Sequence, residues 1–96
     1  MYITIRRYSG VSGSRDEIVQ RGQPVVAIFQ QARGFVGWYL LEAGGGNWAT
    51  VSIFEDQAGA EESTRIAADF IRQNLAQHFP NPPEITMGEV VLHGTR

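Results

Sequence analysis

The chain has 96 residues, of which 43% are hydrophobic and 19% charged, and its eight basic residues are all arginine. That length accommodates one hydrophobic core, so residues 1–96 are predicted to form a single domain. The net charge of -2 excludes a general attraction to nucleic acid. The absence of lysine and cysteine excludes Schiff-base, phosphate-loop, disulfide and thiolate chemistry.

The N-terminus has no pattern typical of a targeting segment. Its residues alternate in polarity and carry charge at Arg6 and Arg7, unlike the apolar centre of a signal peptide. No apolar run approaches the roughly 20 residues that a membrane-spanning helix needs. We therefore expect a cytoplasmic protein with no membrane partner.

The first half of the chain predicts a strand and then an interrupted helix. Residues 2–8 alternate with period two and are rich in β-branched and aromatic side chains, which predicts a strand. Ser14 is a predicted N-cap, with Glu17 at the capping-box position. The helix that follows should bend or break at Gly22 to Pro24, because proline cannot donate the helical hydrogen bond. Gly34 is a suitable stop.

The second half predicts a hairpin, a helix and a last strand. Residues 35–43 and 48–55 are two apolar runs joined by a glycine-rich turn, which is typical of an antiparallel hairpin. A phosphate loop would instead lead from a strand into a helix, so we reject that interpretation of the glycines. Asp56 should cap a second helix of about 20 residues with one apolar face. Residues 84–93 then form the last strand.

This order of elements predicts an α+β, ferredoxin-like βαββαβ domain, with one antiparallel sheet and both helices on one of its faces. The helices should cover the more apolar sheet face, which we assign to Ile3, Ile5, Val36, Leu40, Val51, Ile53, Val90 and Leu92. The uncovered face would then hold Thr4, Arg6, Tyr8, Tyr39, Leu41, Trp48, Thr50, Ser52, Phe54, Val91 and His93. Aromatic and aliphatic groups in that number usually mark an interface, so we expect a homodimer that pairs through this face.

Two segments resemble a known family. Residues 34–41, Gly-Phe-Val-Gly-Trp-Tyr-Leu-Leu, resemble the start of the second strand in the antibiotic-biosynthesis monooxygenases of the dimeric α/β-barrel superfamily. Residues 51–56 and 60–63 resemble that family's passage from the third strand into the second helix. The resemblance implies a dimeric α/β barrel. It also implies a small monooxygenase that needs no cofactor and acts on an aromatic substrate held between helices and sheet.

Haem degradation, another activity of the superfamily, is not favoured. That branch relies on an Asn, a Trp and a His around the porphyrin. Here Asn47 lies in the hairpin turn, Asn74 and His78 lie on or after the second helix, and the first strand has no Asn. A metal site is not expected either, because the two histidines are far apart and the carboxylates are dispersed.

Five side chains are candidates for the site. His93 is a candidate base for a phenol or quinol, next to Arg6 or Ser52 on the predicted sheet, and Tyr39 is the second catalytic candidate. The alternative for His93 is a half-exposed residue near the C-terminus with no special role.

The other three are candidate ligand-binding residues. Trp38 should face the helices and line any cavity there, and Trp48 could stack on an aromatic ligand or pack across the dimer. Arg6 needs a partner on a partly buried face, which would be a ligand or a carboxylate such as Glu89.

Two functions remain open from the sequence. The first is an oxygenase with a cavity between helices and sheet. The second is a non-catalytic homodimeric domain that binds a small ligand or serves a stress response. A closed cavity lined by a histidine or tyrosine would favour the first, and a filled space would rule out the first.

Overall fold

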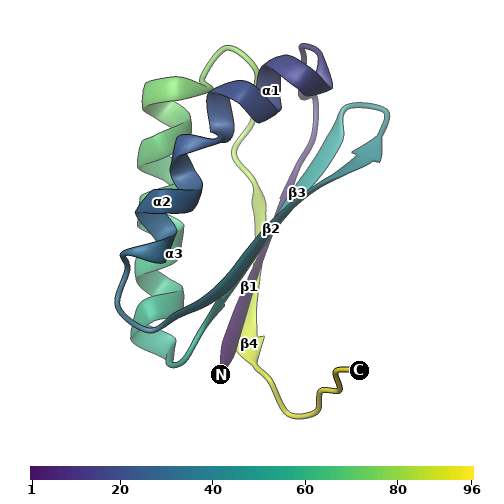
Figure 1. Ribbon diagram of the computed structural model, residues 1–96. Coiled ribbons are helices and arrows are strands. Elements are labelled where there is room, and N and C mark those ends of the chain that lie inside the picture. Colours follow the sequence, from purple (N-terminus) through teal and green to yellow (C-terminus); the bar gives the residue numbers. More distant parts are fainter.

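Four strands and three helices make up the structure, a computed structural model that describes all 96 residues. In chain order the elements are β1 (Tyr2–Tyr8), α1 (Arg15–Gly22), α2 (Pro24–Gln30), β2 (Phe35–Gly44), β3 (Asn47–Phe54), α3 (Gln57–Asn74) and β4 (Glu84–Glu89). The strands form one antiparallel sheet in the order β2-β3-β1-β4, and the helices lie together on one of its faces (Figure 1). The predicted ferredoxin-like fold is confirmed.

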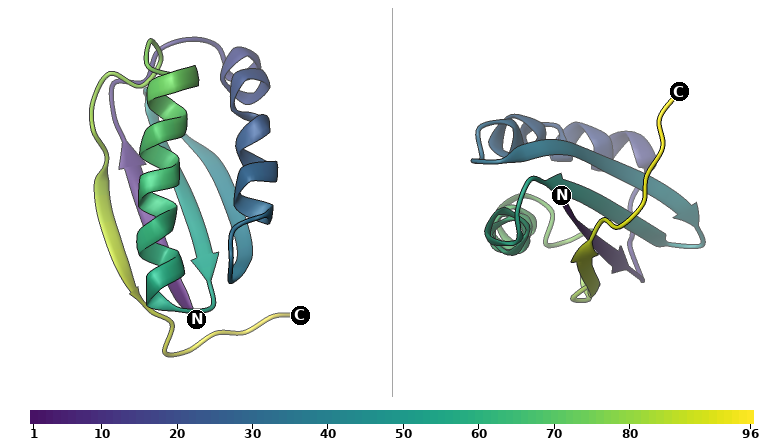
Figure 2. Two further views of the ribbon diagram at one scale, coloured as in Figure 1. Left: turned by 90° about the vertical axis from the view of Figure 1, so that its left-hand side faces the viewer. Right: turned by 90° about the horizontal axis from the view of Figure 1, so that it is seen from below.

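The helix boundaries lie where the sequence places them. Ser14 accepts a hydrogen bond from the backbone N–H of Glu17 at 3.1 Å, and Asp56 accepts one from that of Gly59 at 2.8 Å. The first helix is divided, as predicted: α1 ends at Gly22 and α2 begins at Pro24 (Figure 2). Proline is tolerated there because the first residue of a helix has no helical acceptor for its N–H group.

The glycine-rich segment is a hairpin turn. Gly44, Gly45 and Gly46 have φ values of 88°, 64° and 79°, a region that other residues rarely adopt. The turn joins β2 to β3, and Gly44 pairs with Asn47 across it. The rejection of a phosphate loop is therefore confirmed.

The last strand is shorter than predicted. β4 ends at Glu89, and residues 90–96 lie outside the sheet. Glu89 pairs with Tyr2, the first residue of β1, so the chain beyond it has no neighbouring strand apart from one hydrogen bond from the Val90 N–H to the Met1 carbonyl. A strand cannot extend past its partner without leaving its backbone groups unpaired. Val91 and Leu92 are consequently about as exposed as in an unfolded chain, at 90% and 89%.

The predicted assignment of sheet faces is wrong for β1 and β3. The buried residues of these strands are the ones that we expected on the open face: Thr4, Arg6, Tyr8, Trp48, Thr50, Ser52 and Phe54. The aliphatic residues that alternate with them, Ile3, Ile5, Val51 and Ile53, lie on the side without helices.

The assignment for β2 is largely right. Leu40 packs against the core, while Tyr39 and Leu41 are exposed on the open face. Val36 is the exception, because the pairing register shifts between Phe35 and Gly37 and leaves Val36 half exposed. Such a bulge rotates a side chain away from the side that simple alternation predicts.

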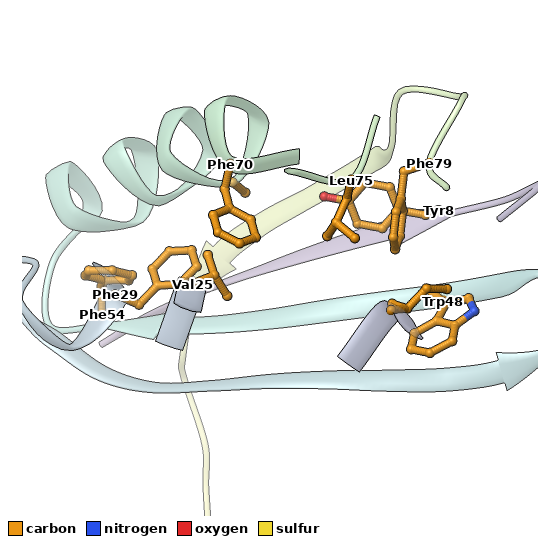
Figure 3. Close-up of a cluster of buried hydrophobic side chains, with 10 residues drawn as sticks. Tyr8, Val25, Phe29, Trp48, Phe54, Phe70, Leu75 and Phe79 are labelled. Atoms are coloured by element: carbon orange, nitrogen blue, oxygen red, sulfur yellow. The ribbon is translucent and has the colours of Figure 1, made fainter. Parts of the chain in front are cut away.

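An aromatic cluster joins the helices to the inner sheet face. Phe29 of α2 stacks on Trp38 with ring centroids 5.7 Å apart, and it also contacts the rings of Phe35 and Phe54. At the other end of the cluster the Tyr8 and Phe79 rings meet edge to face at 5.1 Å (Figure 3). The core therefore has two aromatic ends, with α3 lying across both.

Candidate ligand-binding site

Arg6 is the most unusual side chain of the inner sheet face. It lies in the middle of β1 and is 1% exposed. Its Nη1 atom donates to Ser52 Oγ at 2.8 Å and lies 3.5 Å from Thr50 Oγ1 on β3. Its Nη2 atom donates to Ser63 Oγ at 2.6 Å and to Thr64 Oγ1 at 3.2 Å, both on α3. Four hydroxyl groups therefore surround the guanidinium.

No acidic group balances this charge. The ion pairs of the molecule all involve other residues, and Nε of Arg6 is buried with no hydrogen-bond partner. Burial lowers the pKa of Arg6 because it removes water from the charged form. The predicted ion pair with Glu89 is absent: Arg6 faces Ile85 in the β1–β4 ladder, and Glu89 faces Tyr2.

Tyr8 lies one pleat further along the same face. Burial raises the pKa of its phenol, while the nearby Arg6 charge and a hydrogen bond with Thr50 act in the opposite direction. The phenol therefore stays protonated at neutral pH and is able to donate a hydrogen bond. Arg6 and Tyr8 thus place a cation and a neutral O–H donor side by side on one strand.

A small apolar cavity lies between the helices and the sheet. It has a volume of about 40 Å³, and its walls include Tyr8, Phe29, Trp38, Phe70 and Phe79 but no histidine. Engineered cavities that hold benzene measure about 150 Å³, so an aromatic ring does not fit here. The space between helices and sheet is therefore nearly filled, and the predicted oxygenase site in that space is ruled out.

A larger groove lies next to this cavity, between α3, the proline-rich residues 80–83 and β4. It has a volume of about 400 Å³, within the range of small-molecule sites. Its lining consists of Arg6, Tyr8, Thr64, Ala68, Ile71, Arg72, Ala76, Phe79, Pro80, Asn81, Pro82, Pro83 and Ile85. Two arginines and no acidic residue line this groove, so an anion entering it meets no repulsion from the walls.

Three side chains separate the groove from the internal cavity. Tyr8, Ile71 and Phe79 line both spaces, so they form the wall between them. Figure 3 shows Tyr8 and Phe79 next to each other at one end of the core, close to the end of α3.

The other predicted site residues are dispersed. Trp38 lines the internal cavity, as predicted, and its buried Nε1 has no hydrogen-bond partner. Trp48 is buried in the core and lines neither the cavity nor the groove. Tyr39 is 62% exposed on the open face, and His93 lies in residues 90–96, outside the sheet. The expected position of His93 beside Arg6 or Ser52 is therefore wrong.

Tyr8 and Thr64 are not among the predicted site residues. Tyr8 lies two residues after Arg6 on β1, so both side chains lie on the same face of the sheet. The position of Tyr8 beside the Arg6 charge could therefore have been predicted once the buried face was known. Thr64 could not, because its contact with Arg6 depends on how α3 crosses the sheet.

Two other features would bear on function, a metal site and a membrane-spanning helix. No three side chains of the types that ligate metals gather at one point. None of the helices has the length and hydropathy of a transmembrane segment.

No protein-family model and no curated protein matches the sequence significantly. Solved structures do match. One is a protein of unknown function from Nitrosomonas europaea, with a TM-score of 0.77 at 20% identity, covering 99% of this chain and 93% of that one. Another is a candidate antibiotic biosynthesis monooxygenase from Bordetella bronchiseptica, with a TM-score of 0.74 at 22% identity and coverage of 95% and 97%.

A third match is SnoaB, a cofactor-independent oxygenase from Streptomyces nogalater, with a TM-score of 0.61 at 18% identity and coverage of 98% and 94%. At such identities the similarity establishes the fold, while activity depends on the residues of the site. The chain has the ferredoxin-like fold of the antibiotic biosynthesis monooxygenase-type structures. The resemblance seen in its sequence is confirmed at the level of fold.

Proposed function

We propose that this protein binds a small aromatic molecule in the groove between α3 and β4 and oxidises it with dioxygen, without a cofactor. The observation that supports this proposal is the groove itself: apolar walls with a buried cation, Arg6, and a protonated phenol, Tyr8, at its inner side. One solved structure of the same fold is a cofactor-independent oxygenase.

The chemistry requires an anionic substrate. A phenolate gives an electron to dioxygen far more readily than the neutral phenol does, so an oxygenase without a cofactor must stabilise the phenolate. A hydrogen bond from Tyr8 and the nearby positive charge of Arg6 would lower the pKa of the substrate phenol, and Phe79 would pack against its ring. For 1-naphthol the balanced reaction gives 1,4-naphthoquinone and water. One oxygen atom of dioxygen enters the ring, and the other leaves with two hydrogen atoms of the substrate.

The test is oxygen uptake with 1-naphthol as the probe, together with mass spectrometry of the quinone formed under labelled dioxygen. We expect one labelled oxygen in the product. Tyr8→Phe should lower kcat by about a hundredfold, the usual loss when one donor to a developing anion is removed. Tyr39→Phe is the matched variant on the open face. A loss with Tyr39→Phe alone would restore the prediction from the sequence and overturn this proposal.

A second candidate is a non-catalytic domain that binds the same class of ligand. The observation in its favour is the internal cavity of about 40 Å³, which has no room for a substrate and no histidine in its walls. Binding of 1-naphthol without oxygen uptake would establish this second candidate and exclude the first.

We also propose that the protein is a homodimer, paired through the sheet face without helices. This face has an aliphatic centre of Ile3, Ile5, Val51 and Ile53, with Tyr39 beside it. Aliphatic side chains in neighbouring register on an open face are typical of an interface. Ile3, Ile5, Val51 and Ile53 are residues that were predicted to face the helices, whereas Tyr39 was predicted on the open face. A cytoplasmic location stays a prediction.

A further inference from the structure

The unbalanced charge of Arg6 calls for an explanation. Moving a guanidinium from water into a protein interior costs several kcal/mol, and a carboxylate normally offsets that cost. Here the neighbours of Arg6 are hydroxyl groups, which accept hydrogen bonds but carry no negative charge. The Nε–H group is left with no acceptor at all. A buried cation with a free donor is a site that a negative group from outside would complete.

The groove gives such a group a route to Arg6. Thr64 is half buried, lines the groove, and accepts from Nη2 of Arg6 through the longer of the two hydrogen bonds that this atom donates. An anion in the groove would compete with Thr64 Oγ1 for Nη2 of Arg6. In a guanidinium, Nε–H and one N–H of the neighbouring Nη atom project from the same planar edge, which matches the two oxygens of a carboxylate.

The walls of the groove define the rest of the ligand. Ile71, Phe79, Pro82 and Ile85 are apolar and suit a ring or a short hydrocarbon. Arg72 is exposed, already contacts Asp69, and therefore adds a weaker positive field at the surface. One buried guanidinium is a poor match for a phosphate dianion, which needs more donors than are present, and a good match for a singly charged, planar anion.

We propose that Arg6 and Thr64 form a carboxylate-binding subsite, and that the ligand of the groove is a small aromatic carboxylate. This inference rests on the groove of the proposed function but not on the oxidation. The phenol that would react and the carboxylate that would be recognised are then two groups of one molecule.

The experiment compares 2-naphthoate with 2-naphthamide, which have the same shape and differ in charge, by calorimetric titration of the intact protein. We expect 2-naphthoate to bind at least about tenfold more tightly, the difference that one charge-assisted pair supplies. Arg6→Gln should abolish this preference. Arg65→Gln removes the same charge from the exposed side of α3 and should keep the preference.

A second variant guards against a folding defect in Arg6→Gln. Ala68 is exposed on α3, one turn after Thr64, and lines the groove. Ala68→Glu would place a competing carboxylate on the groove wall and should weaken 2-naphthoate binding at least about tenfold more than Ala68→Gln, which adds the same bulk without the charge. Inorganic phosphate and 2-naphthyl phosphate test the other source of negative charge.

The outcomes separate the proposals. Equal binding of naphthoate and naphthamide overturns the carboxylate subsite and leaves the groove in place. Tighter binding of naphthyl phosphate than of naphthoate overturns the choice of a carboxylate. Binding of neither ring compound overturns the groove as the ligand site. Naphthoate binding without oxidation of 1-naphthol supports the subsite and refutes only the oxygenase.

Discussion

Replacing Arg6 by methionine is expected to change the stability of the free protein very little. The usual rule for a buried ion pair is that removing one partner costs about 3–5 kcal/mol, because the other charge is left unpaired. Arg6 has no acidic partner, so Arg6→Met leaves no such charge behind. What it removes is a set of hydrogen bonds and the cost of burying a cation.

The two effects are of similar size. The two short hydrogen bonds, to Ser52 at 2.8 Å and to Ser63 at 2.6 Å, contribute about 1.5–3 kcal/mol each. Against them stands a desolvation cost of several kcal/mol. Methionine fills much of the same space with a flexible apolar chain. We therefore expect the free energy of unfolding of Arg6→Met to lie within about 2 kcal/mol of the wild-type value.

The assay is urea unfolding at neutral pH, with all variants at one protein concentration, because association would otherwise change the midpoint. A double-mutant cycle isolates the interaction with Ser52. Ser52→Ala alone leaves Nη1 with only the long contact to Thr50 and should cost about 1–3 kcal/mol, whereas in the Arg6→Met background it should cost almost nothing. A loss above about 3 kcal/mol in Arg6→Met would refute this reasoning, because it would mean that the hydrogen bonds of Arg6 outweigh the cost of burying its charge.

Three further outcomes are expected. Ile53→Asp places a charge at the centre of the open sheet face and should convert the proposed dimer into a monomer of 10.6 kDa in light scattering; an unchanged mass contradicts this interface. Because burial raises the pKa of Tyr8 above its ordinary 10.0, the unfolded chain loses this proton first, so the free energy of unfolding should fall above pH 10 by up to about 1.4 kcal/mol per pH unit, and Tyr8→Phe should reduce that fall. Phe70→Ala should cost about 3–5 kcal/mol in urea unfolding. It should also enlarge the internal cavity, so that benzene raises the melting temperature of this variant and not of the wild type.

The order of elements and their boundaries could be predicted from the sequence because local chemistry decides them. Ser14 and Asp56 accept the first hydrogen bonds of their helices, Pro24 divides the first helix, and the glycines after residue 43 take up the backbone angles of a tight turn. Each of these effects acts within a few residues, so it does not depend on the rest of the fold.

The position of the binding site could not be predicted in the same way. Alternation along β1 correctly groups Thr4, Arg6 and Tyr8 on one face, but it does not tell which face packs against the helices. We expected the more apolar face of the sheet to lie inside. That expectation failed because the hydroxyls of Ser52 and Ser63 accept hydrogen bonds from Arg6 and so allow this charged side chain to be buried. The aliphatic side of the same strands is left open, where a second copy of the chain would cover it.

The tertiary structure also determines the environment and the hydrogen-bond partners of Arg6. Its sequence neighbours are compatible with an ion pair on an open face, with a surface charge, or with a ligand contact. Only the crossing of α3 over β1 places the hydroxyls of Ser63 and Thr64 on the guanidinium, 57 and 58 residues away along the chain, and leaves its Nε without an acceptor. Strand period and helix caps are short-range properties that the sequence carries by itself. The partners of a buried charge are distant in the sequence. They depend on which elements pack together in the complete fold and on which face of the sheet the helices cover.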